Sequence, residues 1–218
     1  PQEVRVNLIS NNTSKNKSSY VDLDLSLSNS SIVQPANSLQ NKIKHFLNDY
    51  SEKKTLEELK RIFITYDQNK FYPLIREVFQ CLSIKCFLPR HGVNSLRYDA
   101  LLLENNDAIP IEIKSPSEEK NIGVKAVRQA LENKVILLSR HKKDFPSKSK
   151  TSTLVVGWDV PNERSQDFEL IKDLHKTYNI NISVIGIDSL LKNCIDAVNN
   201  KKRAEFKEFA NLKPGIYK

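Results

Sequence analysis

The chain has 218 residues, of which 39% are hydrophobic and 28% are charged, a balance that excludes a wholly disordered chain and a membrane protein. Its 34 Lys and Arg residues outnumber its 26 Asp and Glu residues, and the net charge of +8 fits a polyanionic partner. No apolar run approaches the roughly 18 residues that span a bilayer, so we expect a soluble protein.

Residues 1 to about 40 are rich in Asn, Ser and Lys, a composition too polar to bury much core. We therefore expect residues 1–54 to form a polar linker or arm. Within it, apolar residues alternate with Asp and Ser at Val21, Leu23, Leu25 and Leu27. This period of two predicts an edge strand, or a strand that pairs with a partner.

Two helices and three short strands are expected next. Thr55, followed by two glutamates, marks the start of the first helix, and the second is predicted over 71–83 with Glu77 beside its apolar stripe. The strands are predicted at 85–88, 98–103 and 108–114, the last two joined by a tight turn.

Helices and strands then alternate along the rest of the chain. Helices are predicted at 124–138 and at 166–177, and a third helix is expected to begin with Asp188 as its N-cap. Strands are predicted at 153–158 and 180–187. From the helix at 71–83 onward the order is α-β-β-β-α-β-α-β-α, which predicts an α/β fold in which helices flank both faces of a mixed central sheet, over residues 55–218.

The most informative stretch lies between Asp99 and Lys114. Side chains at i and i+2 of a strand share a face, so Glu112 and Lys114 project together while Ile111 and Ile113 enter the core. Asp99 can reach Glu112 across the hairpin. Two carboxylates and the Ile113 carbonyl are hard oxygen ligands that suit Mg²⁺. Lys114 could orient or deprotonate a water, its pKa lowered by the cation and by partial burial. This is the machinery of phosphodiester hydrolysis.

Asp99 with Glu112-Ile113-Lys114 resembles the motif of the PD-(D/E)XK nuclease superfamily. Over about 55–218, the layout is most similar to the cleavage domains of FokI-like and AlwI-like type IIS restriction enzymes. The further matching segments are Glu77-Val78-Phe79, Gln129 in the helix after the motif, and Ile187-Asp188-Ser189-Leu190-Leu191. The resemblance implies a restriction-endonuclease-like core and one or two Mg²⁺ ions, with Mn²⁺ as a substitute. The chain departs from the pattern at Tyr98, where the family usually has Pro, and in its short gap between the two acids.

Two further residues have both a functional and an ordinary interpretation. Glu77 could ligate a second metal ion, as in parts of the superfamily, or form a surface salt bridge. Gln129 could hold the catalytic water or the Glu112 carboxylate, or only contact solvent.

Cations surround the motif on both sides. Five residues are expected to contact DNA phosphates: Arg90, His91, Arg97, Lys125 and Arg128. The chain's four histidines lack metal-ligand spacing, which argues against a His-based zinc hydrolase. Its three cysteines favour neither a disulfide framework nor a four-cysteine zinc site and indicate a reducing cytoplasm.

These observations predict a Mg²⁺-dependent DNA endonuclease, the cleavage part of a restriction or defence enzyme. Because the sequence contains no zinc finger or clear helix-turn-helix, we expect target recognition outside it. A chain that begins with Pro1 and lacks Met is expected to be a fragment or a processed product. Cutting both strands of double-stranded DNA implies a transient homodimer. The alternatives are a transposon-end or repair nuclease, a catalytically silent nucleic-acid-binding module, and a protein-interaction domain.

Overall fold

The computed structural model describes residues 38–89, 98–104, 107–139, 148, 150–162 and 164–217. All of them belong to one compact unit, Gln34–Lys218. The strand expected in the polar arm and three of the expected DNA contacts, Arg90, His91 and Arg97, lie outside the described residues. No helix of the described part is long and apolar enough to cross a membrane.

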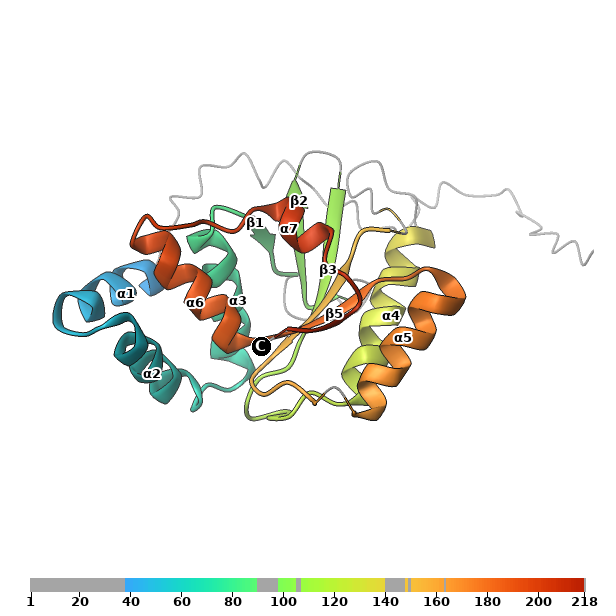
Figure 1. Ribbon diagram of the computed structural model, residues 1–218, viewed down its shortest axis with the longest axis horizontal. Helices are drawn as coiled ribbons and strands as arrows, with labels where there is room; N and C mark the ends of the chain where they lie inside the picture. Colours follow the sequence, from blue (N-terminus) through green and yellow to red (C-terminus); the bar gives the residue numbers. More distant parts are fainter. Residues whose placement is uncertain are drawn as a thin grey trace, which may run out of the picture. The chain divides into compact units, whose positions relative to one another are not determined.

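A mixed six-stranded sheet forms the centre of the unit (Figure 1). Its strands are β1 (Lys85–Phe87), β2 (Ala100–Glu104), β3 (Asp107–Ile113), β4 (Thr153–Gly157), β5 (Ile182–Gly186) and β6 (Gly215–Tyr217), in that spatial order. The first three are antiparallel, whereas β3 to β6 run parallel. Strands β4 and β5 are buried along their whole length, because helices cover both faces, as parallel sheets require.

Of the helices in the described residues, two cover one face of the sheet and five pack on the other side. On the first face, α4 (Val124–Ser139) and α5 (Gln166–Tyr178) bury Val127, Ala130 and Ile171 against Val155 and Val184. The second group packs in the larger core cluster and consists of α1 (Ser38–Asp49), α2 (Glu52–Phe63), α3 (Gln68–Cys81), α6 (Ile187–Val198) and α7 (Phe206–Ala210). Figure 1 shows α4 and α5 on one side of the strands and α1, α2, α3 and α6 on the other. The predicted mixed sheet with helices on both faces is therefore confirmed.

Several boundaries differ from those predicted. The α2 helix begins at Glu52 rather than Thr55, because the Ser51 side chain accepts a hydrogen bond from the Lys54 N–H and caps it. Gly186, with no side-chain cap, precedes α6. Asp188 instead forms an ion pair with Lys60 at 2.6 Å, so its expected capping role is wrong.

Helix α1 lies within the region expected to be a polar arm. Its only buried side chains among polar neighbours are those of Leu39 and Ile43, too few to stand out as an apolar stripe in the sequence. Both join the core cluster that contains α3 and α6. Residues 38–54 thus contribute to the folded unit, which begins before the boundary expected at residue 54.

Candidate active site

Asp99 and Glu112 meet where β2 begins and β3 ends. Ala100 pairs with Ile111 in the antiparallel ladder, and the Asp99 N–H donates to the Ile111 carbonyl at 3.1 Å, which places Asp99 next to Glu112 at the end of the hairpin. Ile111 and Ile113 point into the larger core cluster. Glu112 therefore faces α4 on the other side of the sheet, as the alternation of a strand requires. The predicted meeting of the two acids across the hairpin has this structural basis.

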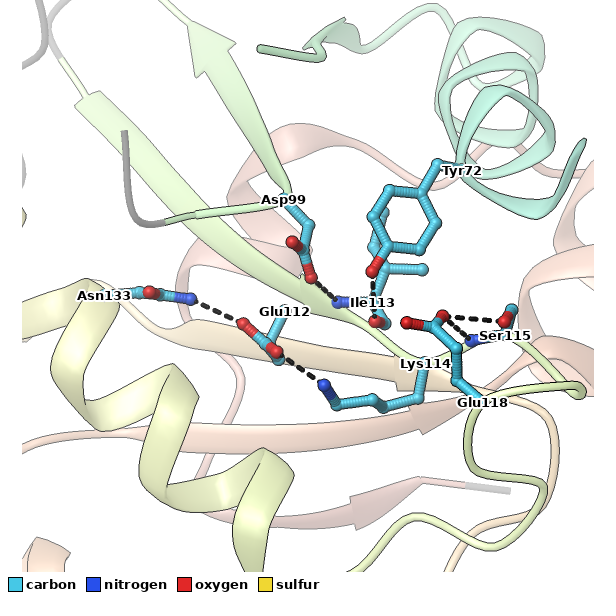
Figure 2. A network of polar contacts seen from close by, with 8 residues as sticks. All are labelled: Tyr72, Asp99, Glu112, Ile113, Lys114, Ser115, Glu118 and Asn133. Atoms are coloured by element: carbon cyan, nitrogen blue, oxygen red, sulfur yellow. Dashed lines mark hydrogen bonds and ion pairs between the residues drawn. The ribbon is translucent and has the colours of Figure 1, made fainter. Parts of the chain in front are cut away.

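A network of polar contacts fixes the site (Figure 2). The Ile113 N–H donates to Asp99 Oδ2 at 2.8 Å, and Lys114 Nζ lies 2.8 Å from Glu112 Oε1. The Lys114 N–H donates to the Val156 carbonyl at 2.8 Å, which ties the end of β3 to β4. The Glu112 and Lys114 side chains are only 5% and 10% exposed, so this pair is buried rather than displayed on a solvated hairpin face.

The second oxygen of Glu112 is held from α4. Asn133 Nδ2 donates to Glu112 Oε2 at 2.9 Å, a contact absent from the sequence-based expectations. Gln129 lies one helical turn earlier on the same side of α4, since residues four apart share a helix face. Its Oε1 atom is buried and has no hydrogen-bond partner among the described residues. Asn133, not Gln129, is the residue that holds Glu112.

Burial and mutual repulsion set the protonation of the two acids. Burial, followed by the charge of Glu112, raises the pKa of Asp99 from 3.8 to about 7, against the opposing effects of the Ile113 N–H and Lys114. Burial also raises the pKa of Glu112, although Lys114 and Asn133 act in the opposite direction. The protein thus places two carboxyl groups close together, and the positive charge beside them is too small to keep both readily ionised.

The expected lowering of the Lys114 pKa included a bound cation, and the protein groups alone act in the other direction. Burial lowers it, but the combined contributions of Glu112, Asp99 and Glu118 outweigh burial and leave the pKa above its ordinary value. With the protein groups alone, Lys114 is an ammonium at neutral pH. This state suits a hydrogen-bond donor and positive charge rather than a general base.

The donor atoms fit a divalent cation. Asp99 and Glu112 supply carboxylate oxygens, and the Ile113 carbonyl supplies a third oxygen, the ligand type that Mg²⁺ prefers. A cation would also relieve the repulsion between the buried acids. The Ile113 carbonyl accepts a hydrogen bond from the Tyr72 hydroxyl at 3.0 Å, which leaves one of its two lone pairs. In the described ranges, no cluster of three or more His, Cys, Asp or Glu side chains is arranged to hold a metal; the expected set has only two such side chains.

Glu77 is not brought to this pair. Its Oε2 atom accepts hydrogen bonds from Ser38 Oγ at 2.6 Å and from the Leu39 N–H at 2.9 Å, so it caps the start of α1. On α3, Glu77 is five residues from Tyr72, a rotation of about 140° around the helix. Since Tyr72 is the α3 residue that reaches the site, the expectation of a metal-ligating Glu77 is not retained.

The two expected DNA contacts that are described, Lys125 and Arg128, point to different places. Both are exposed, but only Lys125 shares the helix face of Gln129 and Asn133. Arg128 lines a shallow hollow between α4 and α5 with Arg164 and Asp173. Lys125 therefore lies on the α4 face that carries Gln129 and Asn133, and Arg128 lies on another flank of α4.

Sequence reasoning also missed Tyr72, Ser115 and Glu118. The Ser115 hydroxyl and N–H donate to Glu118 Oε2 at 2.6 and 3.2 Å, which shapes the turn directly after Lys114. Tyr72 reaches the end of β3 from α3, a contact that no local pattern reveals. Asn133 could have been identified from the sequence, because it is a polar residue on the buried side of α4, four residues after Gln129.

The raised pKa of Asp99 predicts that stability depends on pH when divalent ions are absent. Because the folded pKa of about 7 exceeds the ordinary value of 3.8, the native state keeps a proton that the unfolded state releases. Stability should therefore fall as pH rises through this window and level off above it. We expect a Tm several degrees lower at about pH 8 than at about pH 5 in EDTA. The difference should shrink in Asp99→Asn; an equal difference in both proteins would contradict this account.

Comparisons with known proteins show a similarity of fold. No protein-family model and no curated protein matches the chain. A structure of restriction endonuclease FokI bound to DNA matches with a TM-score of 0.51 and 16% identity, over 81% of this chain and 32% of that one. A structure of restriction endonuclease FokI matches with a TM-score of 0.52 and 12% identity, over 82% and 34%. This chain thus spans about a third of the length of FokI, and at such low identity the likeness concerns the fold alone.

Proposed function

We propose that this protein is a Mg²⁺-dependent DNA endonuclease of the PD-(D/E)XK type, the cleavage part of a restriction or defence enzyme. The observation that carries the proposal is the convergence of Asp99, Glu112 and Lys114 at the joined ends of two strands, with Lys114 Nζ 2.8 Å from Glu112. The likeness to a nuclease fold seen with DNA bound supports it.

The residues that would hold the cation are Asp99, Glu112 and the carbonyl of Ile113. A bound Mg²⁺ would polarise the phosphoryl oxygens and favour ionisation of a water. Lys114, as an ammonium, would donate to the attacking water or to a phosphate oxygen and stabilise the negative charge that develops there. The Oε1 atom of Gln129, which has no partner among the described residues, would accept a hydrogen bond from that water. As the water adds to phosphorus, one P–O ester bond breaks.

The substrate in this proposal is double-stranded DNA. The net charge of +8 favours a polyanion, and Lys125 lies on the helix face that also carries Asn133. Arg90, His91, Arg97 and Arg128 are proposed to add phosphate contacts. Target recognition would come from outside this sequence, and two copies would assemble transiently to cut both strands. A transposon-end or repair nuclease would use the same chemistry on another DNA structure.

Exchanging the divalent ion tests this function. With supercoiled plasmid and excess protein, we expect nicking in Mg²⁺ or Mn²⁺ and none in Ca²⁺, whereas Ca²⁺ should still support DNA binding. Ca²⁺ is larger and less demanding in geometry, so it occupies such sites without aligning the reaction.

The outcomes separate the competing functions. Salt-sensitive DNA binding without cleavage in any ion would indicate a silent binding module. Neither binding nor cleavage would indicate a protein-interaction domain. Equal cutting in Ca²⁺ and Mg²⁺, or equal cutting by Asp99→Ala, would contradict the proposed metal chemistry.

A further inference from the structure

We infer that Asn133 is a positioning residue, whose side-chain amide holds Glu112 in the orientation that binds the divalent cation. This inference rests on the proposed function and assigns to α4 a role that the motif on β3 does not contain. It predicts that the metal affinity of the site depends on a neutral side chain that never touches the metal.

The contact is short and buried. Asn133 is 3% exposed and Glu112 is 4% exposed, and Asn133 Nδ2 lies 2.9 Å from Glu112 Oε2. A carboxylate can only accept hydrogen bonds, so Asn133 must present its NH₂ group to Glu112. Lys114 holds the other oxygen, Oε1, at 2.8 Å. With both oxygens held, the carboxylate cannot turn without breaking one of these bonds (Figure 2).

A neutral donor suits this position better than a cation or an apolar side chain. The neighbouring buried positions of α4 include Ala126, Val127, Ala130 and Leu137, and packing alone would be satisfied by another apolar residue. An Arg or Lys at this position would hold Glu112 but would also neutralise its charge and repel an incoming cation. The amide fixes the carboxylate without adding a second positive charge to that of Lys114, which already pairs with Glu112.

Gln129 does not duplicate this role. It is only partly buried, and its Oε1 atom has no partner in the described part of the chain. The side-chain donors that contact Glu112 among the described residues are Asn133 and Lys114, and the free Gln129 oxygen is an acceptor suited to a donor such as water. The two residues on one face of α4 therefore have different roles. Asn133 positions a metal ligand, and Gln129 remains available to accept a hydrogen bond on the substrate side.

The test compares Asn133→Leu with the wild-type chain. The two side chains have similar volume, so the variant removes the donor with little change in packing. We expect Mn²⁺ affinity, measured by isothermal titration calorimetry on the 218-residue chain, to fall by about 10- to 100-fold. Plasmid nicking should shift to higher Mg²⁺ concentrations and recover in part when Mg²⁺ is raised. DNA affinity in EDTA should not change.

Two controls separate positioning from general damage to α4. Leu137→Ala removes buried packing from the same helix, one turn beyond Asn133, and should lower the Tm without weakening Mn²⁺ affinity. Adding Asn133→Leu to Glu112→Gln should weaken Mn²⁺ binding little further, because the group that Asn133 positions is already changed. If Asn133→Leu fails to fold, Asn133→Ala replaces it in both comparisons.

The possible results distinguish the positioning role of Asn133 from the proposed nuclease function. A folded Asn133→Leu that binds Mn²⁺ as tightly as wild type, while wild type binds Mn²⁺ and cuts DNA, would overturn this inference and leave the proposed function standing. A wild-type chain that binds no Mn²⁺ and cuts no DNA would overturn both. An equal loss of Mn²⁺ affinity in Leu137→Ala would also overturn the positioning role.

Discussion

The Asp99→Asn variant is expected to lose about a thousandfold or more of the rate of DNA cleavage while folding at least as stably as wild type. An amide oxygen is a weaker ligand than a carboxylate, and removing several kcal/mol of metal-derived stabilisation of the transition state costs about tenfold per 1.4 kcal/mol. The folded state is expected to become more stable because burial and the charge of Glu112 make the ionised form of Asp99 unfavourable, raising its pKa to about 7. The amide oxygen can still accept from the Ile113 N–H.

Single-turnover nicking and thermal unfolding at about pH 8 in EDTA measure the two effects. Asp107→Asn is the matched control, because Asp107 begins the same strand that carries Glu112 and bonds instead to Thr151 at 2.8 Å. Its cleavage rate should equal that of wild type. A cleaving Asp99→Asn, or one that is clearly less stable than wild type at this pH, would contradict the role given to Asp99.

The Lys114→Met variant is expected to lose at least about a hundredfold in cleavage rate, because it removes the preorganised charge that stabilises the transition state. It should also be less stable, unlike Asp99→Asn. Removing one partner of a buried ion pair leaves an uncompensated charge and typically costs about 3–5 kcal/mol. Both members of this pair are nearly inaccessible, with side-chain exposures of 10% and 5%.

The destabilisation of Lys114→Met should depend on pH in a defined direction. Burial already raises the pKa of Glu112, and losing Lys114 removes the largest opposing contribution. Glu112 would then take up a proton as pH falls, so the loss of stability should shrink in acid. Denaturant unfolding at about pH 8 and about pH 5.5 measures this difference.

Lys172→Met provides the control for removing a lysine. Lys172 is exposed on α5 and pairs with Glu169 at 3.3 Å, so its replacement should change stability by less than about 0.5 kcal/mol and leave cleavage unchanged. A Lys114→Met protein that matched this control in stability or in activity would show that Lys114 is not part of a buried catalytic pair.

The part of the site that was predictable from sequence is the part built by local geometry. The alternation around Glu112 and Ile113 follows from the period of a strand, and the antiparallel pairing of β2 with β3 brings Asp99 next to Glu112. Asn133 and Tyr72 could not be assigned in this way, because they reach β3 from opposite faces of the sheet. Their contacts depend on how α4 and α3 pack, which no short pattern encodes. The direction of the Lys114 pKa likewise depends on three surrounding carboxylates.

The same distinction applies to the fold. Short and mostly apolar runs such as β4 and β5 indicate their burial directly, and the alternation of helices and strands after β3 predicts the covered parallel sheet. Helix α1 is different, because only Leu39 and Ile43 among its residues are buried. Its place in the fold depends on Glu77 of α3, which bonds its first residues. A capping contact between residues almost forty positions apart in sequence leaves no periodic signal.

Anomalous scattering from Mn²⁺ in crystals of this chain tests the metal site most directly. The account predicts one strong peak at about 2.1 Å from oxygens of both Asp99 and Glu112, on the side of Ile113 that carries its carbonyl, and its disappearance in Asp99→Asn. Mn²⁺ bound only at other residues, or a peak unchanged in Asp99→Asn, would contradict the account.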